Sequence, residues 1–355
     1  RSGARRRAHA RGAQKKKVGR TDGARIKGGP SQYPERLLRS PFSGSPGLFV
    51  HLPVHNSTFH TQTVLFHMAD GVFFRVALLA DVQYADKPDR DIGGAVRYYR
   101  TSLSRLRSAV NQLNHNEQLT AVIHLGDIVD GNVSEAASLA DFSAVVRLFR
   151  RIRHPVFHVV GNHCHDVGRP TLLRELGRPY YSETLAPGWC VAVLDTTDLG
   201  VNGASEELIK EGREWLDAHA ELEHANEWNG GVGKAQLHWL HTQLKQARQR
   251  GEHTIVVGHM PMMAAASSAM HLTFNHAEVC ALLDEFCDVC PLYICGHCHH
   301  GGYARSAAGV HHVTVEGIVE MPPGAERSHA VLTVSQAEIV IDGGGGGVSS
   351  RTLRF

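Results

Sequence analysis

The sequence predicts an α/β fold in which a helix-covered sheet is joined by a second sheet from the later part of the chain. Two patterns support this class. Apolar strand-like runs alternate with amphipathic helical stretches in the first half, which is typical of a sheet covered by helices. Toward the C-terminus short strand-like runs follow one another with few helices between them. These later strands are expected to form the second sheet.

The elements follow in chain order from residue 73. The first half predicts strands and helices, in order, at 73–80 (strand), 94–115 (helix), 121–125 (strand), 135–152 (helix, begun by Ser134) and 156–160 (strand). Strands are then expected at 180–185, 190–195, 254–257, 292–295, 302–306, 311–316, 329–334 and 337–341, and helices at 205–225, 233–250 and 276–286. The glycine run 343–347 fits either a flexible linker or a close-packed turn.

Composition separates an N-terminal extension from a folded body. The chain has 355 residues, 42% hydrophobic and 20% charged, and no apolar run of about 18 residues that would predict a membrane span. Residues 1–40 hold 13 Lys and Arg against two acidic residues, while the whole chain totals only +2. We therefore expect residues 1–70 to be a basic extension, disordered or for organelle targeting, and residues 71–355 to be the folded domain.

Cysteine usage points to a reducing compartment. The seven cysteines are an odd number without secretory spacing, which favours free thiols and an intracellular, cytoplasmic protein. The pairs Cys287-x-x-Cys290 and Cys295-x-x-Cys298 have the spacing of a zinc knuckle. Because Cys287, Cys290 and Cys295 flank an apolar strand, we expect these three to be buried as small hydrophobic residues instead.

Polar residues follow five of the predicted strands. In open α/β sheets, ligands gather where the strands reach their carboxyl ends. The inventory combines carboxylates, amides and imidazoles without thiolates, which favours Mn, Fe, Zn or Co over Ca. It exceeds what one ion needs, so two ions sharing a carboxylate are expected. The segments are Asp81-Val82-Gln83, Gly126-Asp127, Gly161-Asn162-His163, Gly258-His259 and Gly296-His297-Cys298-His299.

This order of motifs resembles the signature of the calcineurin-like metallophosphoesterases and, within them, the manganese-dependent ADP-ribose/CDP-alcohol diphosphatase family. The resemblance covers roughly residues 73–355 and implies a four-layer α/β/β/α sandwich of two mixed sheets flanked by helices. Gln83 stands where most relatives of the superfamily have His. The segments that carry the closer resemblance are 80–86, 97–100, 125–131, Asn229-Gly230-Gly231 with 236–240, and 296–303.

The resemblance also implies a role for each motif residue. Asp81, Gln83, Asp127 and His299 would hold a first divalent metal, with Asp127 bridging to a second. Asn162, His259 and His297 would hold that second metal. The implied ions are Mn, with Fe, Zn, Co or Mg as alternatives, and the implied nucleophile is a metal-activated hydroxide. Asn162 and His163 are the implied catalytic residues, and His163 would contact the phosphate or protonate the leaving oxygen.

Two further expectations concern metal affinity and substrate. A neutral amide is a poorer ligand than imidazole, so Gln83 should hold the first ion less tightly, which fits a preference for added Mn. Weaker candidates for substrate contact lie near the motifs, although aromatic residues at such positions also serve as core. These candidates are Tyr84, Arg97, His271, Phe274, Asn275 and Tyr303.

The leading functional hypothesis is hydrolysis of the pyrophosphate bond in ADP-ribose, CDP-alcohols or related nucleoside diphosphate esters. Another metallophosphoesterase activity, such as that of a cyclic-nucleotide phosphodiesterase or a protein phosphatase, is the alternative. A non-catalytic scaffold on the same fold is disfavoured because the set of ligands is complete apart from Gln83. We expect a monomer acting on a small molecule, without a membrane or nucleic-acid partner.

Overall fold

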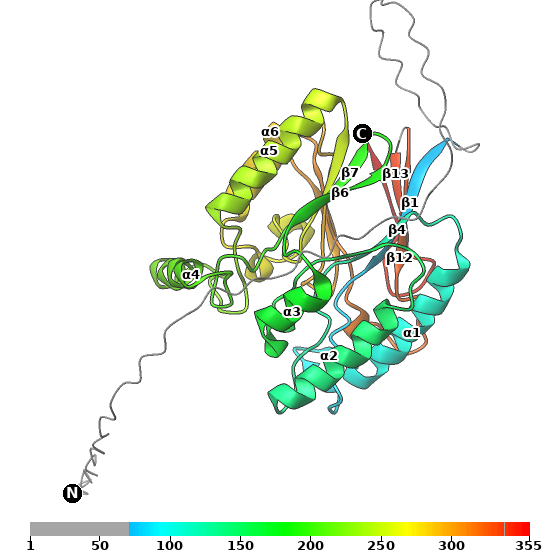
Figure 1. The fold of residues 1–355 in the computed structure, drawn as a ribbon, viewed down its shortest axis with the longest axis vertical. Helices are drawn as coiled ribbons and strands as arrows, with labels where there is room; N and C mark the ends of the chain where they lie inside the picture. Colours follow the sequence, from blue (N-terminus) through cyan, green and yellow to red (C-terminus); the bar gives the residue numbers. More distant parts are fainter. Residues whose placement is uncertain (1–70, 337) are drawn as a thin grey trace, which may run out of the picture. The chain divides into compact units, whose positions relative to one another are not determined.

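A computed structural model describes residues 71–336 and 338–355, and the basic extension 1–70 lies outside them. Within this part of the chain two six-stranded sheets carry the fold (Figure 1). The first has the order β14-β13-β12-β1-β4-β5 and the second the order β10-β11-β9-β8-β7-β6. The strands of the first sheet are β1 (Val72–Leu79), β4 (Ala121–His124), β5 (Val156–His158), β12 (Ala330–Ser335), β13 (Glu338–Asp342) and β14 (Arg351–Arg354). Those of the second are β6 (Tyr181–Ala186), β7 (Trp189–Val193), β8 (His253–Val257), β9 (Leu292–Cys295), β10 (Gly302–Arg305) and β11 (His311–Thr314).

Both sheets are mixed, and this decides where the motif residues meet. In the first sheet β1, β4 and β5 run parallel, whereas β12, β13 and β14 join as antiparallel neighbours. In the second sheet β7, β8, β9 and β11 run parallel, with β6 and β10 antiparallel at the two edges. Parallel neighbours bring their carboxyl ends to one edge of a sheet, and all five predicted polar segments follow such strands.

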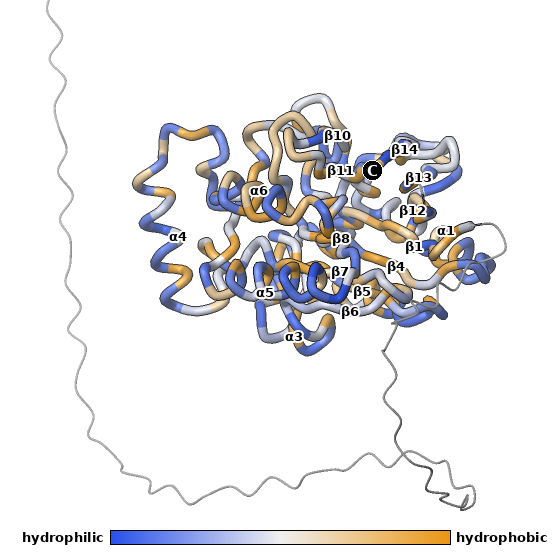
Figure 2. The backbone as a smooth tube through the Cα atoms, turned by 90° about the horizontal axis from the view of Figure 1, so that it is seen from above, coloured by the Kyte–Doolittle hydropathy of each residue, from blue (hydrophilic) through white to orange (hydrophobic). Residues whose placement is uncertain are grey.

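The main core fills the space between the sheets and continues on the outer face of the first sheet, because side chains alternate across each strand. Val191 and Val193 of β7 are fully buried with Val76 and Leu78 of β1 in this cluster. Their neighbour Ala192 belongs instead to a second cluster on the outer face of the second sheet. Figure 2 shows the hydrophobic residues concentrated along central strands such as β4 and β8. Because these strands are buried on both faces, their sequences are continuous apolar runs rather than alternating ones.

Helices cover the outer face of each sheet. Leu106 and Leu113 of α1 and Phe142 of α2 belong to the main core, whereas Leu240 of α5 and Leu283 of α6 pack on the outer face of the second sheet. Figure 1 shows α1 and α2 on one side of the sheets and α5 and α6 on the other. The α/β fold of two mixed sheets flanked by helices is therefore confirmed. The helices are α1 (Tyr99–His115), α2 (Glu135–Phe149), α3 (Arg169–Leu176), α4 (Glu206–Ala218), α5 (Lys234–Arg250) and α6 (His276–Glu285).

Several local features differ from the sequence prediction. The predicted helix at 94–115 begins only at Tyr99, because residues 90–97 form a two-stranded hairpin of β2 (Arg90–Ile92) and β3 (Ala95–Arg97). The sequence analysis also missed α3 and β14. The glycine run 343–347 is a close-packed turn between β13 and β14, since a Cβ on Gly343 would lie 1.8 Å from the carbonyl oxygen of Val348.

The cysteines follow the prediction with one exception. All seven thiols are free, and Cys290, Cys295 and Cys298 are buried. Cys287 is exposed, so its predicted burial was wrong: it lies in the connection between α6 and β9, outside both elements. The one cluster of potential metal ligands found among His, Cys, Asp and Glu of the described residues contains no cysteine.

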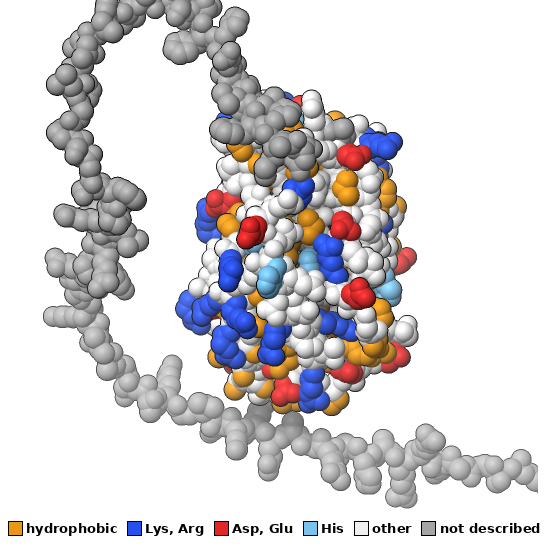
Figure 3. Space-filling view, turned by 90° about the vertical axis from the view of Figure 1, so that its right-hand side faces the viewer, with side chains coloured by type: hydrophobic (Ala, Val, Ile, Leu, Met, Phe, Trp, Pro, Cys, Tyr) orange, Lys and Arg blue, Asp and Glu red, His pale blue; other side chains and the backbone are white. Residues whose placement is uncertain are grey.

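The surface shows the mixture expected from the composition. On the face drawn in Figure 3, Lys and Arg, Asp and Glu, and small separate hydrophobic patches are interspersed. In the part of the chain that the structure covers, no helix combines the length and the apolar character needed to cross a membrane.

Candidate metal centre

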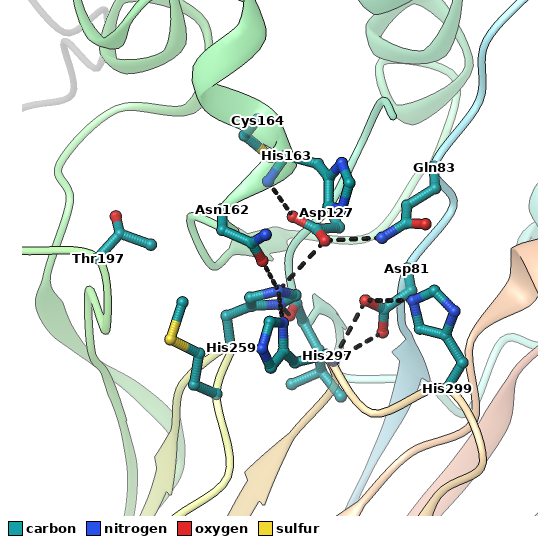
Figure 4. Close-up of polar contacts among 12 residues, drawn as sticks. Asp81, Gln83, Asp127, Asn162, His163, Cys164, Thr197, His259, His297 and His299 are labelled. Atoms are coloured by element: carbon teal, nitrogen blue, oxygen red, sulfur yellow. Dashed lines mark hydrogen bonds and ion pairs between the residues drawn. The ribbon is translucent and has the colours of Figure 1, made fainter. Parts of the chain in front are cut away.

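The structure brings the predicted ligands together where the two sheets meet (Figure 4). Asp127, His259 and His297 are buried, and one ligand atom of each lies within 4.8 Å of the others. Asn162 joins them, since its Oδ1 lies 3.0 Å from Nε2 of His259. These four residues come from the loops after β4, β5, β8 and β9. Their grouping supports the predicted ligand set of a second metal.

The remaining candidates form an adjoining group. Oδ1 of Asp81 lies 3.5 Å from Nε2 of His299, and Gln83 donates from Nε2 to Oδ2 of Asp127 at 2.8 Å. Oε1 of Gln83 and Nε2 of His299 are buried and have no hydrogen-bond partner within the described chain. An unpaired buried polar atom is costly unless a ligand satisfies it. A divalent ion bound by Asp81, Gln83, Asp127 and His299 would satisfy both atoms, so these residues fit a first metal.

The backbone of the site is held in unusual conformations. Four non-glycine residues among those described have positive φ: Asp81 at 51°, Gln83 at 39°, Asp127 at 57° and His297 at 68°. All four are predicted ligands. L-residues adopt this region at a cost of order 1–3 kcal/mol, and such strain persists where the surroundings impose it, often at functional sites. The loops after the strands are therefore shaped to direct these side chains inward.

Two positions in the motifs require glycine because another side chain lies too close for a Cβ atom. A Cβ on Gly126 would lie 2.4 Å from Nδ1 of His259, and a Cβ on Gly161 would lie 2.2 Å from Oδ1 of Asp127. Real Cβ atoms do not approach other atoms so closely, and the neighbours here are buried ligands that cannot withdraw. Each of these two glycines thus makes room for a predicted ligand that follows another strand, β8 for Gly126 and β4 for Gly161.

The charges in the metal-free site are complementary. Burial raises the pKa of Asp127, but His259 and His163 outweigh it and hold this pKa well below its ordinary value. Burial alone would lower the pKa of His259, yet the charge of Asp127 raises it to about 9. Burial and the neighbouring His259 lower the pKa of His297 well below its ordinary value. Asp127 ionised and His297 neutral are the states in which these groups bind metals, whereas His259 is protonated without metal and would release its proton when an ion binds.

His163 lies beside the metal ligands and contacts a carboxylate of its own. Its backbone N–H donates to Oδ1 of Asp127 at 3.0 Å, and its Nδ1 lies 3.4 Å from Oδ1 of Asp130. Asp130 also accepts from Nζ of Lys87 at 2.6 Å and from Nη1 of Arg97 at 3.1 Å. The imidazole of His163 is about a quarter exposed, so it faces the open side of the site.

The short helix η1 (His163–Val167) that carries His163 is anchored from behind. Nε2 of His165 lies 2.9 Å from Oγ1 of Thr197, and Thr197 in turn donates to Oδ1 of the buried Asp195 at 2.6 Å. Arg169 of α3 pairs with the other oxygen of Asp195. This network fixes the segment after β5 and therefore the position of His163.

A cavity of about 370 Å³ opens over the metal ligands. That volume lies in the range typical of small-molecule sites. Three of the eight exposed large hydrophobic side chains in the described residues lie at this one cavity: Ile92, Trp228 and Met270. Exposed apolar side chains that converge beside polar groups commonly mark a binding site. The cavity is lined by Gln83, Ile92, Arg97, Asn162, His163, Trp228, Met270, His271, His297 and His299.

Only two of the weaker predicted substrate contacts line this cavity, Arg97 and His271. Phe274 is buried and stacks on Trp215 with ring centroids 4.3 Å apart. Asn275 bonds the backbone of Val232 with both its amide nitrogen and its oxygen.

The other two candidates also lie outside it. Tyr84 forms an isolated bridge with Val129 and packs against the main core, and Tyr303 stacks on His311. The aromatic rings of Phe274, Tyr84 and Tyr303 therefore pack against other side chains of the protein rather than lining the cavity.

The sequence analysis missed Ile92, Trp228, Met270 and Glu320. Ile92 lies just before the predicted helix at 94–115, in a hairpin that the sequence did not predict, and Met270 lies in the short helix η3 (Ala269–His271), which is too short for a periodic pattern. Trp228 directly precedes the Asn229-Gly230-Gly231 motif, and that adjacency was the available signal. Glu320 contacts His299 from the short helix η4 (Ile318–Glu320), and local sequence gave no sign of it.

Comparison with known proteins agrees with this geometry. The model of the calcineurin-like phosphoesterase family matches residues 74–301. A crystal structure described as a dimetal phosphatase from Danio rerio superposes with a TM-score of 0.74 and 29% identity, over 80% of this chain and 99% of that one. The chain belongs to the calcineurin-like phosphoesterases.

Comparison with curated relatives identifies a family within the calcineurin-like phosphoesterases. A protein from Arabidopsis thaliana is 36% identical over 71% of this chain and 88% of its own length. One from Danio rerio is 33% identical over 75% and 92%, and one from Homo sapiens is 30% identical over 71% and 85%. Each is named manganese-dependent ADP-ribose/CDP-alcohol diphosphatase. Within the calcineurin-like phosphoesterases the chain belongs to this family, as its motifs indicated.

Proposed function

We propose that the protein hydrolyses the pyrophosphate bond of ADP-ribose, CDP-alcohols or related nucleoside diphosphate esters, using two divalent ions of which Mn²⁺ is the expected one. The observation that carries the proposal is the pair of adjoining ligand groups that share Asp127 beneath one cavity. The names of the curated relatives support the substrate class and the metal. The proposed catalytic domain is 71–355.

The assignment of ligands is part of the proposal. Asp81, Gln83, Asp127 and His299 would hold the first ion, and Asp127, Asn162, His259 and His297 the second. Bound at these positions, the ions would polarise phosphoryl oxygens and lower the pKa of water. The overall reaction adds one water across the P–O–P bridge and leaves two monophosphates.

The protein's own groups would orient the substrate and handle a proton. His163 faces the cavity beside the ligands, where it can donate to a phosphate oxygen that gains negative charge. Asp130 holds that imidazole from behind. Arg97 lines the same cavity, so its cationic group lies near the polar end of a bound diphosphate. Ile92, Trp228 and Met270 form the apolar rim on which the nucleobase or the alcohol would rest.

A comparison of substrates tests the activity. Purified protein with Mn²⁺ is incubated separately with ADP-ribose, CDP-choline, a cyclic nucleotide and a phosphopeptide, and the initial rates are compared. Turnover of the first two substrates, abolished by a chelator and restored by Mn²⁺, is the expected result. Turnover of only the cyclic nucleotide or the phosphopeptide would reject the proposed substrate class while retaining the metal centre.

We further propose a monomeric cytoplasmic protein. Every proposed ligand and cavity residue comes from this one chain, so the site needs no second copy. The seven free thiols support a reducing compartment. Light scattering after size-exclusion chromatography tests the first point and cell fractionation the second.

A further inference from the structure

The three proposed histidine ligands each use one ring nitrogen toward the metal centre and the other toward a hydrogen-bond acceptor. A neutral imidazole carries its hydrogen on one nitrogen only, and that hydrogen follows the acceptor. The nitrogen without hydrogen is then free to bind a metal. For His259 the acceptor is the backbone: Nδ1 lies 2.8 Å from the carbonyl oxygen of Leu125. Substitution of a side chain cannot remove this acceptor.

His297 depends on a side chain. Its Nε2 lies 2.9 Å from Oδ1 of Asn229, which is buried. The amide of Asn229 cannot be turned round, because its nitrogen donates to the carbonyl oxygens of His224 at 3.0 Å and Met270 at 2.8 Å. Its oxygen must therefore face His297, and Nε2 of His297 carries the hydrogen. Nδ1 remains free and faces Nε2 of His259 at 3.1 Å.

His299 depends on a carboxylate. Its Nδ1 lies 2.7 Å from Oε1 of Glu320, and Nε of Arg97 donates to that same oxygen at 3.2 Å. Arg97 thus holds the carboxylate in place while His299 donates to it. The other nitrogen, Nε2, faces Asp81 and has no hydrogen-bond partner within the described residues. The two side-chain acceptors serve different histidines, and each histidine belongs to a different proposed metal.

We propose that Glu320 and Asn229 are positioning residues of the metal centre, Glu320 for the first metal through His299 and Asn229 for the second through His297. The inference rests on the proposed metal centre and deepens it. Loss of either acceptor allows the imidazole to turn or to place its hydrogen on the wrong nitrogen. Removing such outer partners lowers metal affinity about 10- to 100-fold. Here each loss affects one ion and spares the other.

Mn²⁺ binding by the metal-free full chain tests this assignment. Isothermal titration gives the affinities, and electron paramagnetic resonance distinguishes a coupled pair of Mn²⁺ ions from a single one. Wild type is expected to bind two coupled ions. Glu320→Ala and Asn229→Ala should each lose about 10- to 100-fold in affinity for one ion and show an uncoupled signal at limiting Mn²⁺. Glu320→Gln keeps an oxygen acceptor and should lose much less.

Double substitutions identify which ion is affected. In a His299→Ala background, Glu320→Ala should cause no further loss, because its only route to the metal has been removed. Asn229→Ala in the same background should weaken the remaining ion. Glu316→Ala is the matched control, since this carboxylate also pairs with an arginine, Arg351 at 3.8 Å, and should keep both ions.

The inference is overturned if the alanine variants bind both ions like wild type, or if Glu320→Gln loses as much as Glu320→Ala. It is also overturned if Glu320→Ala weakens binding further in the His299→Ala background. Thermal unfolding of the metal-free variants checks folding. Where an alanine variant does not fold, Glu320→Met or Asn229→Leu, which keeps the bulk of the side chain but no oxygen acceptor, takes its place in the double-substitution test. Wild type that binds two ions but leaves ADP-ribose intact would reject the proposed function and retain this inference.

Discussion

Nδ1 of His163 lies 3.4 Å from Oδ1 of Asp130, so the proposed proton donor of the site has a carboxylate directly behind it. The carboxylate is itself held by Lys87 and Arg97. His163 follows the proposed ligand Asn162 in sequence, yet its ring contacts Asp130 rather than the group of proposed ligands. A residue can therefore be adjacent to a ligand along the chain and still serve a separate role.

Replacing His163 by Ala should lower kcat for ADP-ribose by about 10²- to 10⁴-fold, because a positioned proton donor contributes that much. The Mn²⁺ content of the protein should stay near that of wild type. Metal analysis and steady-state kinetics of the same preparation check both points. Loss of metal in the variant would instead identify His163 as a ligand. Asp130→Asn should cause a smaller loss of kcat, since it acts through His163.

Gln83→His should bind the first ion more tightly than wild type, because imidazole is a better ligand than a neutral amide. The substitution also removes the hydrogen bond that Gln83 donates to Asp127. The Mn²⁺ concentration needed for half-maximal activity should fall. An unchanged Mn²⁺ dependence would contradict the assignment of Gln83 to the first ion.

Trp228→Ala should raise KM for ADP-ribose by roughly 5- to 100-fold and change kcat less, since stacking of a base on an aromatic ring is worth about 1–3 kcal/mol. The indole lies at the cavity rim, about a third exposed, beside His271. Tyr303→Ala is the control, because its ring packs on His311 outside the cavity. Equal effects of the two substitutions would show that Trp228 does not contact the substrate.

Gly161→Ala should weaken Mn²⁺ binding, since the new methyl group would lie 2.2 Å from Oδ1 of Asp127 and must displace it. Both proposed ions share this carboxylate, so both affinities should fall. Gly188→Ala, where a Cβ would meet nothing within 4 Å, is a control for metal binding, although its φ of 78° carries a backbone cost. Calorimetry on the metal-free proteins makes the comparison. Unchanged Mn²⁺ affinity in Gly161→Ala would show that the loop can shift without cost.

Acid should destabilise the protein between about pH 6.5 and pH 4. Burial lowers the pKa of His312 to about 4, and neither of its ring nitrogens has a hydrogen-bond partner in the described chain. Below pH 6.5 the unfolded chain therefore takes up a proton before the folded one does. The contribution of neutral His312 to the free energy of unfolding is complete above pH 6.5. It is lost as the pH drops toward 4, and the loss is on the order of 3 kcal/mol.

His312→Phe keeps a ring of similar shape but removes this titration. Its free energy of unfolding should fall less between pH 7 and pH 4.5 than that of wild type, as measured by urea denaturation. Some acid sensitivity should remain, because burial also lowers the pKa of His158 and His329 to about 4. Parallel pH profiles for variant and wild type would show that His312 does not contribute.

The grouping of the candidate ligands could be predicted because these residues follow strands. The buried runs that end at Asp81, Asp127 and His259 are local patterns, and the parallel sheet order places such ends together. The residues that line the cavity were predicted poorly, because they follow no strand. Trp228 lies in a turn and Met270 in the short helix η3 (Ala269–His271), and their meeting over the predicted ligands depends on tertiary packing. Phe274 and Tyr303 have the right residue type near the right motifs, but the fold uses them as support.

The hairpin of β2 and β3 shows the same limit in the fold. Its residues 90–97 directly precede the amphipathic helix α1, and the predicted helix at 94–115 took in part of the hairpin. The turn at Gly93 and Gly94 was therefore not predicted. The missed hairpin matters for the site, because it places Ile92 at the cavity rim and Arg97 beside Asp130. The role of Glu320 could not be predicted at all, because its contact with His299 joins segments with no shared local pattern.

The proposed ligands come from both sheets, so metal binding should stabilise the folded protein. Asp81, Asp127 and Asn162 follow strands of the first sheet, and His259, His297 and His299 follow strands of the second. Ions held by both groups would crosslink the two halves of the main core. An ion that binds only the folded state at 100 times its Kd adds about 2.7 kcal/mol to the free energy of unfolding. A cell that withholds metal would thus lose the folded protein faster, as well as its activity.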